Sequence, residues 1–322
     1  MKTRSDLDLL VVGDCNPDVL VLGEDVVPEF GQQEKLVGSI SLVVGGSAAI
    51  TAVAAARLGL RVSLAAVVGA DPAGEFMLAL LASEGVDTSA VIVRPGLATG
   101  MTVALSSGTD RAIITATAAM TSLTASDVPR ALLASARHLH VSSYFLLEQS
   151  LGPGLAGLLA EARASGTTTS LDTNWDPAGQ WGGDQLREVL DQTGVLLPNA
   201  EEACRLSGQA TVQAALPKLT SAVAKVVVKL GASGALSADG SLVQRVAPPA
   251  GLAGEVIDAT GAGDCFNAGL IAGLLRGLDL AAATRLACAV GSASTRAAGG
   301  TAAAPDLAAA LALANTVLTS GE

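Results

Sequence analysis

Residues Asp258-Ala259-Thr260-Gly261-Ala262-Gly263-Asp264-Cys265-Phe266 join a loop of small side chains to an apolar segment that continues to Arg276 with the pattern of a helix. Because Gly261 and Gly263 have no side chain, their backbone N–H groups can approach a ligand closely. The first turn of a helix presents N–H groups that lack intrahelical partners, and it carries a partial positive charge. The stretch therefore predicts an anion site at a helix N-terminus, suited to phosphate.

Asp264 follows these glycines directly, so its carboxylate would lie beside a bound phosphate that repels it. An aspartate with an ordinary pKa of about 3.9 is ionised at neutral pH and can take a proton from a hydroxyl group that attacks phosphorus. We interpret Asp264 as a candidate general base, and Gly261, Ala262 and Gly263 as donors of amides that stabilise charge on a transferring phosphoryl group. The alternative is a glycine-rich turn with an acidic residue at a helix start and no catalytic role.

The composition favours one large α/β unit. The chain has 322 residues, of which 50% are hydrophobic and only 2% aromatic, so helices and sheet are expected to pack through small side chains. The net charge is −11 and no basic run occurs. Because nucleic-acid backbones are bound by clustered Lys and Arg, we expect no nucleic-acid partner.

The cysteine and histidine patterns favour a reducing compartment without a zinc site. The four cysteines form no C-x-x-C pair, and the two histidines, His138 and His140, lack the spacing of a zinc motif. No apolar stretch is long enough to span a membrane, and the charged N-terminus does not resemble a signal peptide. We therefore expect a cytoplasmic protein with no membrane contact. The cysteines are Cys15, Cys204, Cys265 and Cys288.

Strand and helix patterns alternate along most of the chain, which predicts a mainly parallel sheet with helices on both faces. Two segments, about 19–42 and 99–117, lack a helical period, and the second alternates like paired strands. The expected strands are Leu9–Val12, Leu139–Val141, Thr168–Leu171, Val195–Leu197 and Lys225–Lys229, and the expected helices are Leu155–Ala164, Gln185–Thr193, Glu201–Ser207 and Asp264–Arg276.

The nonapeptide DATGAGDCF resembles the C-terminal signature of the ribokinase-like (PfkB) carbohydrate kinases. Further segments resemble motifs of that family in the same order: Val12–Asp18, Val44–Ala49, Val67–Gly74, Pro198–Glu202 and Val228–Gly234. The resemblance covers nearly the whole chain. It implies a ribokinase-like three-layer α/β/α sandwich, as a single kinase domain over residues 1–322, with a small β-strand lid formed by about 19–42 and 99–117.

The substrate-binding candidates come from the resemblance and from positions at strand ends. The asparagine and aspartate after the first strand can bond sugar hydroxyls, and the glycine pair would let the backbone approach the substrate. Asx turns or solvated surface carboxylates are the alternatives for the polar members. The candidates are Asn16, Asp18, Gly45, Gly46, Glu148, Asp172 and Asp264 itself.

The resemblance also implies ATP and Mg²⁺ as cofactors. Glu202 shares a helical face with Asn199 and would orient water around Mg²⁺, a role compatible with Asn199 as a helix cap. The implied ATP-binding positions are Asn199, Lys229, Gly231, Gly234, Thr260, Gly261 and Gly263. Related enzymes bind K⁺ beside the anion loop, and the matching backbone positions are Asp258, Thr260, Ser294, Ala297 and Gly299.

The implied activity is ATP-dependent phosphorylation of a hydroxyl group on a sugar or sugar-like molecule. Ile50 stands where the family often has an asparagine that bonds a sugar hydroxyl, which argues against ribose itself. One alternative is a nucleoside kinase of the same fold, in which Tyr144, Phe145 or Ile50 would contact a base. A catalytically silent sugar-binding protein is disfavoured by the intact Asp264 and glycine loop. Relatives that pair their lids imply a homodimer through the lid.

Overall fold

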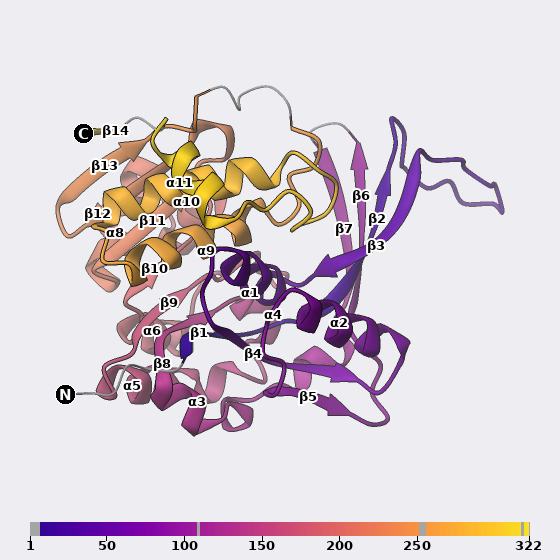
Figure 1. Ribbon diagram of the computed structural model, residues 1–322, viewed down its shortest axis with the longest axis horizontal. Helices are drawn as coiled ribbons and strands as arrows, with labels where there is room; N and C mark the ends of the chain where they lie inside the picture. Colours follow the sequence, from indigo (N-terminus) through magenta and orange to yellow (C-terminus); the bar gives the residue numbers. More distant parts are fainter. Residues whose placement is uncertain (1–6, 108–109, 251–255, 317–318, 322) are drawn as a thin grey trace.

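The strands of the protein form two separate sheets. In this computed structural model, residues 7–107, 110–250, 256–316 and 319–321 are described. A ten-stranded sheet has the order β14-β13-β12-β11-β10-β9-β8-β1-β4-β5, and a four-stranded sheet has the order β3-β2-β6-β7. Figure 1 shows helices on both faces of the large sheet and the small sheet at one side of it. The predicted α/β class with a mainly parallel sheet is confirmed.

The large sheet is parallel from β5 to β11 and antiparallel from β11 to β14. Its strands are β1 (Leu7–Val12), β4 (Val62–Gly69), β5 (Val91–Arg94), β8 (Ala136–Val141), β9 (Thr168–Leu171), β10 (Val195–Leu196), β11 (Lys225–Lys229), β12 (Ala235–Asp239), β13 (Leu242–Val246) and β14 (Thr319–Gly321). Because the parallel strands run the same way, their carboxyl ends meet at one edge, which is where ligands bind in open α/β sheets.

Alternate residues of the central strand enter cores on opposite faces of this sheet. Leu10 and Val12 belong to one apolar cluster, whereas Leu9 and Val11 belong to another. A strand buried on both faces is continuously apolar, which explains the run in β1. The helices are α1 (Ser47–Arg57), α2 (Pro72–Ser83), α3 (Arg130–Ser135), α4 (Tyr144–Leu147), α5 (Gly152–Ala164), α6 (Asp184–Asp191), α7 (Ala200–Ser207), α8 (Val212–Ala222), α9 (Ala262–Leu275), α10 (Leu280–Ser294) and α11 (Leu307–Ala314).

Helices α9 and α10 approach each other through small side chains. A Cβ atom added to Gly269 would lie 2.8 Å from the Cα of Ala287, and one added to Gly273 would lie 2.8 Å from the Cα of Ala283. Neither position has room for a larger residue. The predicted packing through small residues is therefore realised at the helix that carries Asp264.

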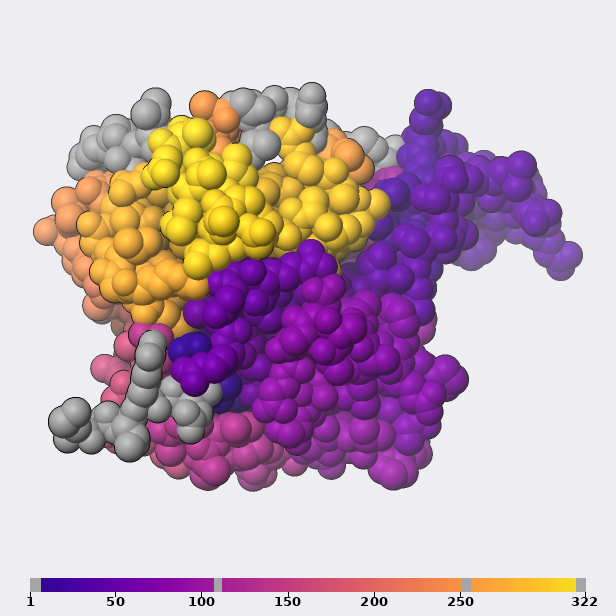
Figure 2. Space-filling view, in the orientation of Figure 1, coloured from indigo at the N-terminus to yellow at the C-terminus, as the bar shows by residue number. Residues whose placement is uncertain are grey.

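The small sheet consists of β2 (Asn16–Leu22), β3 (Ser39–Gly45), β6 (Met101–Ser107) and β7 (Asp110–Ala116). It projects from the body together with the β2–β3 connection (Figure 2). The strands extend beyond the expected segment 19–42 at both ends, because β2 begins at Asn16 and β3 ends at Gly45, so Asn16 and Asp18 are paired residues of β2 rather than part of a turn after β1. Residues 108–109 of the expected turn lie outside the described residues.

Its two faces differ in chemistry, as the register requires. Asp18 pairs with Thr102, and Thr102 pairs with Thr115, so these polar side chains share one face. The other face carries the paired row Leu42, Val19, Val103 and Ile114.

Predicted and observed elements differ mainly at their ends. Helix α9 begins at Ala262 rather than Asp264, because Gly261 is its N-cap. Within the described ranges, none of the helices combines the length and apolar character that crossing a bilayer requires.

Candidate active site

The glycine loop before α9 packs closely against the segment around Gly300 and lies next to Lys229. Gly261 adopts a φ of 69°, a left-handed conformation that favours glycine. A Cβ atom on Gly261 would lie 2.6 Å from the Cα of Gly300, and one on Gly263 would lie 3.5 Å from Nζ of Lys229. The ammonium group of Lys229 is therefore a neighbour of the loop, which adds a positive charge to the helix N-terminus.

The carboxylate of Asp258 holds this loop through hydrogen bonds to Thr260 and Gly299. Its Oδ1 accepts hydrogen bonds from the backbone N–H of Thr260 at 2.9 Å and from the Thr260 hydroxyl at 2.7 Å. Its Oδ2 accepts from the backbone N–H of Gly299 at 2.8 Å. Three of the positions expected to surround K⁺ are thereby brought together. Of the other two, Ser294 ends α10 and Ala297 lies in the turn that leads to Gly299.

Asp264 lies in the first turn of α9 and is 9% exposed. Burial, followed by the nearby charge of Asp172, raises its pKa well above the usual aspartate value, although Lys229 and a hydrogen bond from Ser47 act in the opposite direction. The ordinary pKa expected from the sequence is therefore wrong. The backbone carbonyl of Asp264 accepts from the hydroxyl of Thr51 on α1 at 3.3 Å.

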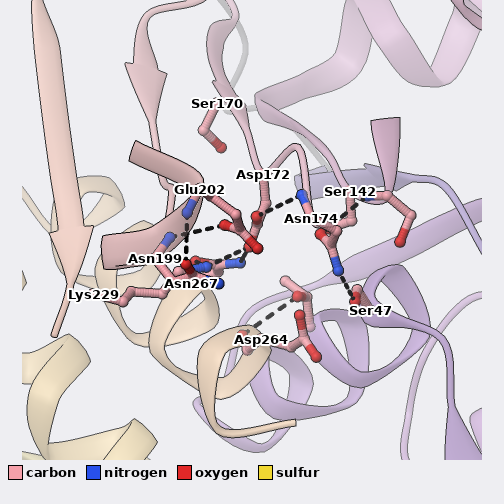
Figure 3. Close-up of polar contacts among 12 residues, drawn as sticks. Ser47, Ser142, Ser170, Asp172, Asn174, Asn199, Glu202, Lys229, Asp264 and Asn267 are labelled. Carbon is pink, nitrogen blue, oxygen red and sulfur yellow. Dashed lines mark hydrogen bonds and ion pairs between the residues drawn. The ribbon is translucent and has the colours of Figure 1, made fainter. Parts of the chain in front are cut away.

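Asp172 stands at the centre of the polar network in Figure 3. Its Oδ2 accepts from Nζ of Lys229 at 2.5 Å and from Nδ2 of Asn267 at 2.6 Å. Asn267 lies on α9, on the same face as Asp264. Asp172 therefore connects the end of β9, the end of β11 and the helix of the candidate base.

Asn199 and Glu202 form a capping box at the start of α7. The backbone N–H of Glu202 donates to Oδ1 of Asn199 at 2.9 Å, and the backbone N–H of Asn199 donates to Oε2 of Glu202 at 2.8 Å. Burial, with a further contribution from Asp172, raises the pKa of Glu202 to about 7. The cap predicted for Asn199 is confirmed.

Gly231 and Gly234 have a clear conformational role in the β11–β12 connection. Their φ angles are 57° and 84°, and a Cβ atom on Gly234 would lie 2.0 Å from the carbonyl oxygen of Val246. Only glycine fits at Gly234, whereas at Gly231 the left-handed φ favours glycine and the space beside it is open. The turn directly follows Lys229, so it places both glycines near the end of β11.

The side chains of Asn16 and Asp18 contact each other on the same face of the small sheet. Nδ2 of Asn16 donates to Oδ1 of Asp18 at 3.0 Å and to the hydroxyl of Thr102 at 3.2 Å. A Cβ atom on Gly45 would lie 1.9 Å from Oδ1 of Asp18, so this glycine makes room for that carboxylate. Gly46, with a φ of 79°, is the N-cap of α1.

The structure adds Asp14, Ser47 and Asn174 to the candidate site, although no sequence motif marks them. Asp14 accepts from the backbone N–H groups of Ser47 at 3.0 Å and Ala48 at 2.9 Å, and so caps α1 across a long sequence separation. Nδ2 of Asn174 donates to Oγ of Ser47 at 2.6 Å. Through Ser47, the segment after β9 is connected to Asp264. None of these contacts has a local sequence signal. Asn267, which bonds Asp172, could have been noticed because it follows Asp264 by one helical turn.

Glu148 is not brought to this network by any described contact. It follows the short helix α4 rather than a strand end, because α4 intervenes after β8. Its carboxylate accepts from the hydroxyl of Tyr144 at 3.4 Å, and its backbone carbonyl accepts from Nε2 of Gln185 at 3.1 Å. The structure therefore gives Glu148 partners on α4 and α6.

Ile50 also differs from expectation. It is 3% exposed, and its side chain fills the space where Cβ atoms of Gly261 and Gly300 would lie, at 3.1 and 2.7 Å. Ile50 thus packs against the anion loop. It is not available to contact a substrate base.

Comparison with known proteins decides the family. Residues 6–307 match the family described as pfkB family carbohydrate kinase. The chain belongs to this family. It is 31% identical to a ribokinase of Haemophilus influenzae over 83% of this chain and 85% of the relative. It is 29% identical to a nucleoside kinase of Methanothermobacter thermautotrophicus, with 89% of each chain covered.

A solved structure of the same family supports the fold. A putative ribokinase II from E. coli in complex with ATP and Mg²⁺ has a TM-score of 0.82 and 25% identity, covering 96% of this chain and 99% of that one. The predicted family and the predicted kinase class are confirmed.

The residues of this chain fit the same two cofactors. The N-terminus of α9 with its small residues, and the ammonium group of Lys229 next to Gly263, suit phosphate groups. The carboxylate of Glu202 is an oxygen donor of the kind that Mg²⁺ and its bound water prefer.

Proposed function

We propose that this chain transfers the γ-phosphoryl group of ATP to a hydroxyl group of a sugar or sugar-like molecule. The observation that carries the proposal is the position of Asp264. It lies in the first turn of α9, directly after the glycine loop, and Lys229 flanks that loop. A base and an anion site at one helix N-terminus are what in-line attack on a phosphoryl group requires.

In this proposal, Asp264 takes the proton of the attacking hydroxyl. Its raised pKa makes the ionised carboxylate a stronger base. The backbone amides of Gly261, Ala262 and Gly263 hold the charge that develops on the phosphoryl oxygens, and they are already oriented by the helix. These amides therefore need little reorganisation during the reaction.

The acceptor lies between Asp264 and the small sheet. Asn16 and Asp18 bind its hydroxyl groups from β2, while Gly45 and Gly46 keep the adjacent backbone close. The four-stranded sheet then acts as the lid of a single kinase domain over residues 1–322. Glu148 stays a candidate for the acceptor side, and its described partners are Tyr144 and Gln185.

ATP and Mg²⁺ would be held on the other side of Asp172. Lys229, Thr260, Gly261 and Gly263 would surround the phosphates, and Asn199, Gly231 and Gly234 would border the nucleotide. When bound, Mg²⁺ neutralises charge on the transferring phosphoryl group. Glu202 would orient the water of that ion through Oε1, since Oε2 serves the capping box.

A monovalent cation, K⁺, would bind behind the anion loop. Asp258 already joins Thr260 to Gly299, and backbone carbonyls in this region would be its ligands. The remaining positions of this proposed site are Ser294 and Ala297.

The apolar face of the small sheet supports a homodimer through the lid. Ile40, Leu42 and Ile114 on that face are 66%, 46% and 63% exposed. A contiguous apolar sheet face is a typical site of association. The cytoplasm, which supplies ATP, is the compartment we propose for this reaction.

Phosphorylation of a nucleoside is the second candidate. The observation that favours it is the half-exposed indole ring of Trp175, at the end of a row of aromatic rings, because nucleobases stack on such rings. The nucleoside kinase among the relatives is consistent with it.

The test measures ADP release from ATP and Mg²⁺ with sugars, sugar acids and nucleosides as acceptors. We expect turnover with one acceptor class and its loss, by at least 10²-fold, in Asp264→Asn, which keeps the shape of the side chain. Asp191→Asn is the control, because this exposed side chain lies on α6, outside the site. Acceptor-dependent turnover that survives in Asp264→Asn would overturn the proposed base.

A further inference from the structure

Aromatic side chains are scarce in this chain and are concentrated in one place. The sequence has two Trp, one Tyr and four Phe. Tyr144, Phe145, Trp181 and Trp175 form a continuous row with successive ring centroids 5.3, 5.4 and 5.0 Å apart, each pair edge to face. Both tryptophans of the protein therefore belong to the segment that follows β9.

The row leads from the core to the surface. Tyr144, Phe145 and Trp181 are buried at 0%, 6% and 9% exposure, whereas Trp175 is 50% exposed. A single exposed apolar residue is common and needs no explanation by itself. Trp175 differs from such a residue because contacts on both sides of it in the chain hold its loop in place.

On its C-terminal side, a buried carboxylate fixes the loop. Asp176 is 2% exposed and accepts from the backbone N–H groups of Ala178 at 2.8 Å, Gln180 at 2.6 Å and Trp181 at 2.7 Å. Such a carboxylate makes a short loop rigid. Trp175 is therefore held in place by its neighbour while its own ring stays half open to solvent.

On its N-terminal side, the loop is attached to the candidate active site. Asn174 has a φ of 55°, and its Nδ2 donates to Oγ of Ser47 at 2.6 Å. Ser47 in turn bonds the carboxyl group of Asp264. In Figure 3 the side chain of Asn174 reaches Ser47, and Asp264 is drawn in the same part of the view. Trp175 is thus one residue removed from a side chain that reaches the candidate base through a single serine.

We propose that the indole ring of Trp175 is a platform on which the phosphoryl acceptor stacks the flat, apolar face of its ring, with the reacting hydroxyl at Asp264. This deepens the proposed function and rests on it. The electron-rich face of an indole attracts both a heterocyclic base and the C–H face of a sugar ring. A platform that is rigid before binding loses little entropy when the acceptor arrives.

The experiment compares Trp175→Ala, Trp175→Phe and wild type, with D-ribose, D-fructose, adenosine and cytidine as acceptors. KM for the acceptor, KM for ATP and kcat are measured separately. Gln180→Ala is the matched control, because this exposed residue lies in the same loop and its described side-chain hydrogen bond goes to the carbonyl of Ala178. Trp fluorescence during acceptor titration in Trp181→Phe, where Trp175 is the only indole, reports contact without turnover.

We expect Trp175→Ala to raise KM for the acceptor about tenfold, with KM for ATP unchanged and Trp175→Phe intermediate. A larger effect on nucleosides than on sugars would identify a base as the stacked group, and the reverse would identify a sugar ring. Turnover with an unchanged acceptor KM in Trp175→Ala overturns the platform but leaves the kinase proposal intact. Equal increases in both KM values would also overturn it, since they indicate a distorted loop. Absence of ATP-dependent turnover with every acceptor counts against the proposed function itself, and the platform falls with it.

Discussion

Nζ of Lys229 lies 2.5 Å from Oδ2 of Asp172, and the two side chains retain only 12% and 3% of their exposure. A buried ion pair adds little folding stability compared with well-packed apolar residues, but removing one partner leaves a buried charge without a counter-charge. Here the remaining charges would be those of Asp172 and its neighbours Glu202 and Asp264, all of which interact with Lys229.

Lys229→Met should therefore lower the free energy of unfolding by about 3–5 kcal/mol. Lys225 at the other end of β11 is the control, because its ion pair with Asp239 is 40% and 45% exposed. Lys225→Met should change stability by less than about 1 kcal/mol. Urea unfolding of both variants makes the comparison, and equal losses would show that the buried pair has no special role.

The rate should depend on pH through Asp264. The base must be ionised to act, and its pKa is raised by burial and by Asp172. The acid limb of kcat/KM should therefore lie above the ordinary aspartate range, with the rate increasing as pH increases. A limb centred near 4 would contradict the raised value.

The same shift has the opposite consequence for stability. An aspartate with a raised folded-state pKa favours the folded state below its unfolded pKa and loses that contribution as pH rises through the folded value. Asp264→Asn, which cannot ionise, should be at least as stable as wild type at neutral pH, although it is inactive. Thermal unfolding measured at acidic and neutral pH checks this sign.

Ile50 should affect the chemical step without contacting the acceptor. Ile50→Ala opens a cavity against Gly261 and Gly300, at a cost of about 2–5 kcal/mol, and loosens the anion loop. We expect a lower kcat with an unchanged acceptor KM. Leu81→Ala in the same apolar cluster should lose similar stability with kcat retained below its melting temperature. If both variants lose kcat equally, Ile50 acts through stability alone.

The cysteines should differ sharply in reactivity. Burial raises the pKa values of the Cys265 and Cys288 thiols to about 12, and it raises that of Cys15 as well. An alkylating reagent at about pH 8 should therefore modify only the partly exposed Cys204 in the folded protein, and all the cysteines after denaturation. Mass spectrometry with a parallel activity assay tests this. Rapid inhibition through Cys265 would contradict its burial.

Ile114→Asp should dissociate a dimer that forms through the small sheet. The substitution places a charge in the exposed apolar face, which must be desolvated on association. Ile113→Asp is the control, since Ile113 is 56% exposed on the opposite face of β7. Sedimentation analysis of both variants decides the matter. A wild-type protein that is monomeric at every concentration tested would contradict the proposed dimer interface on the small sheet.

Local sequence signals predicted the parts of the site that are local. The glycine loop, the helix after it and the Asn199–Glu202 cap depend on neighbouring residues, so their geometry could be inferred. Asp14, Asn174 and Ser47 meet only because β1, β9 and α1 are brought to one sheet edge, and no short pattern encodes that meeting. No local pattern predicts the short helix α4 that separates Glu148 from the end of β8.

The glycines of α9 that lie against Ala287 and Ala283 leave that helix no space in which to shift. The proposed base and anion loop therefore lie on a helix whose close packing on α10 involves none of the proposed acceptor-binding residues. Asn16 and Asp18 belong to the small sheet and Trp175 to a separate loop. If the proposed roles hold, acceptor preference can be changed through those two parts, while the packing that fixes α9 stays as it is.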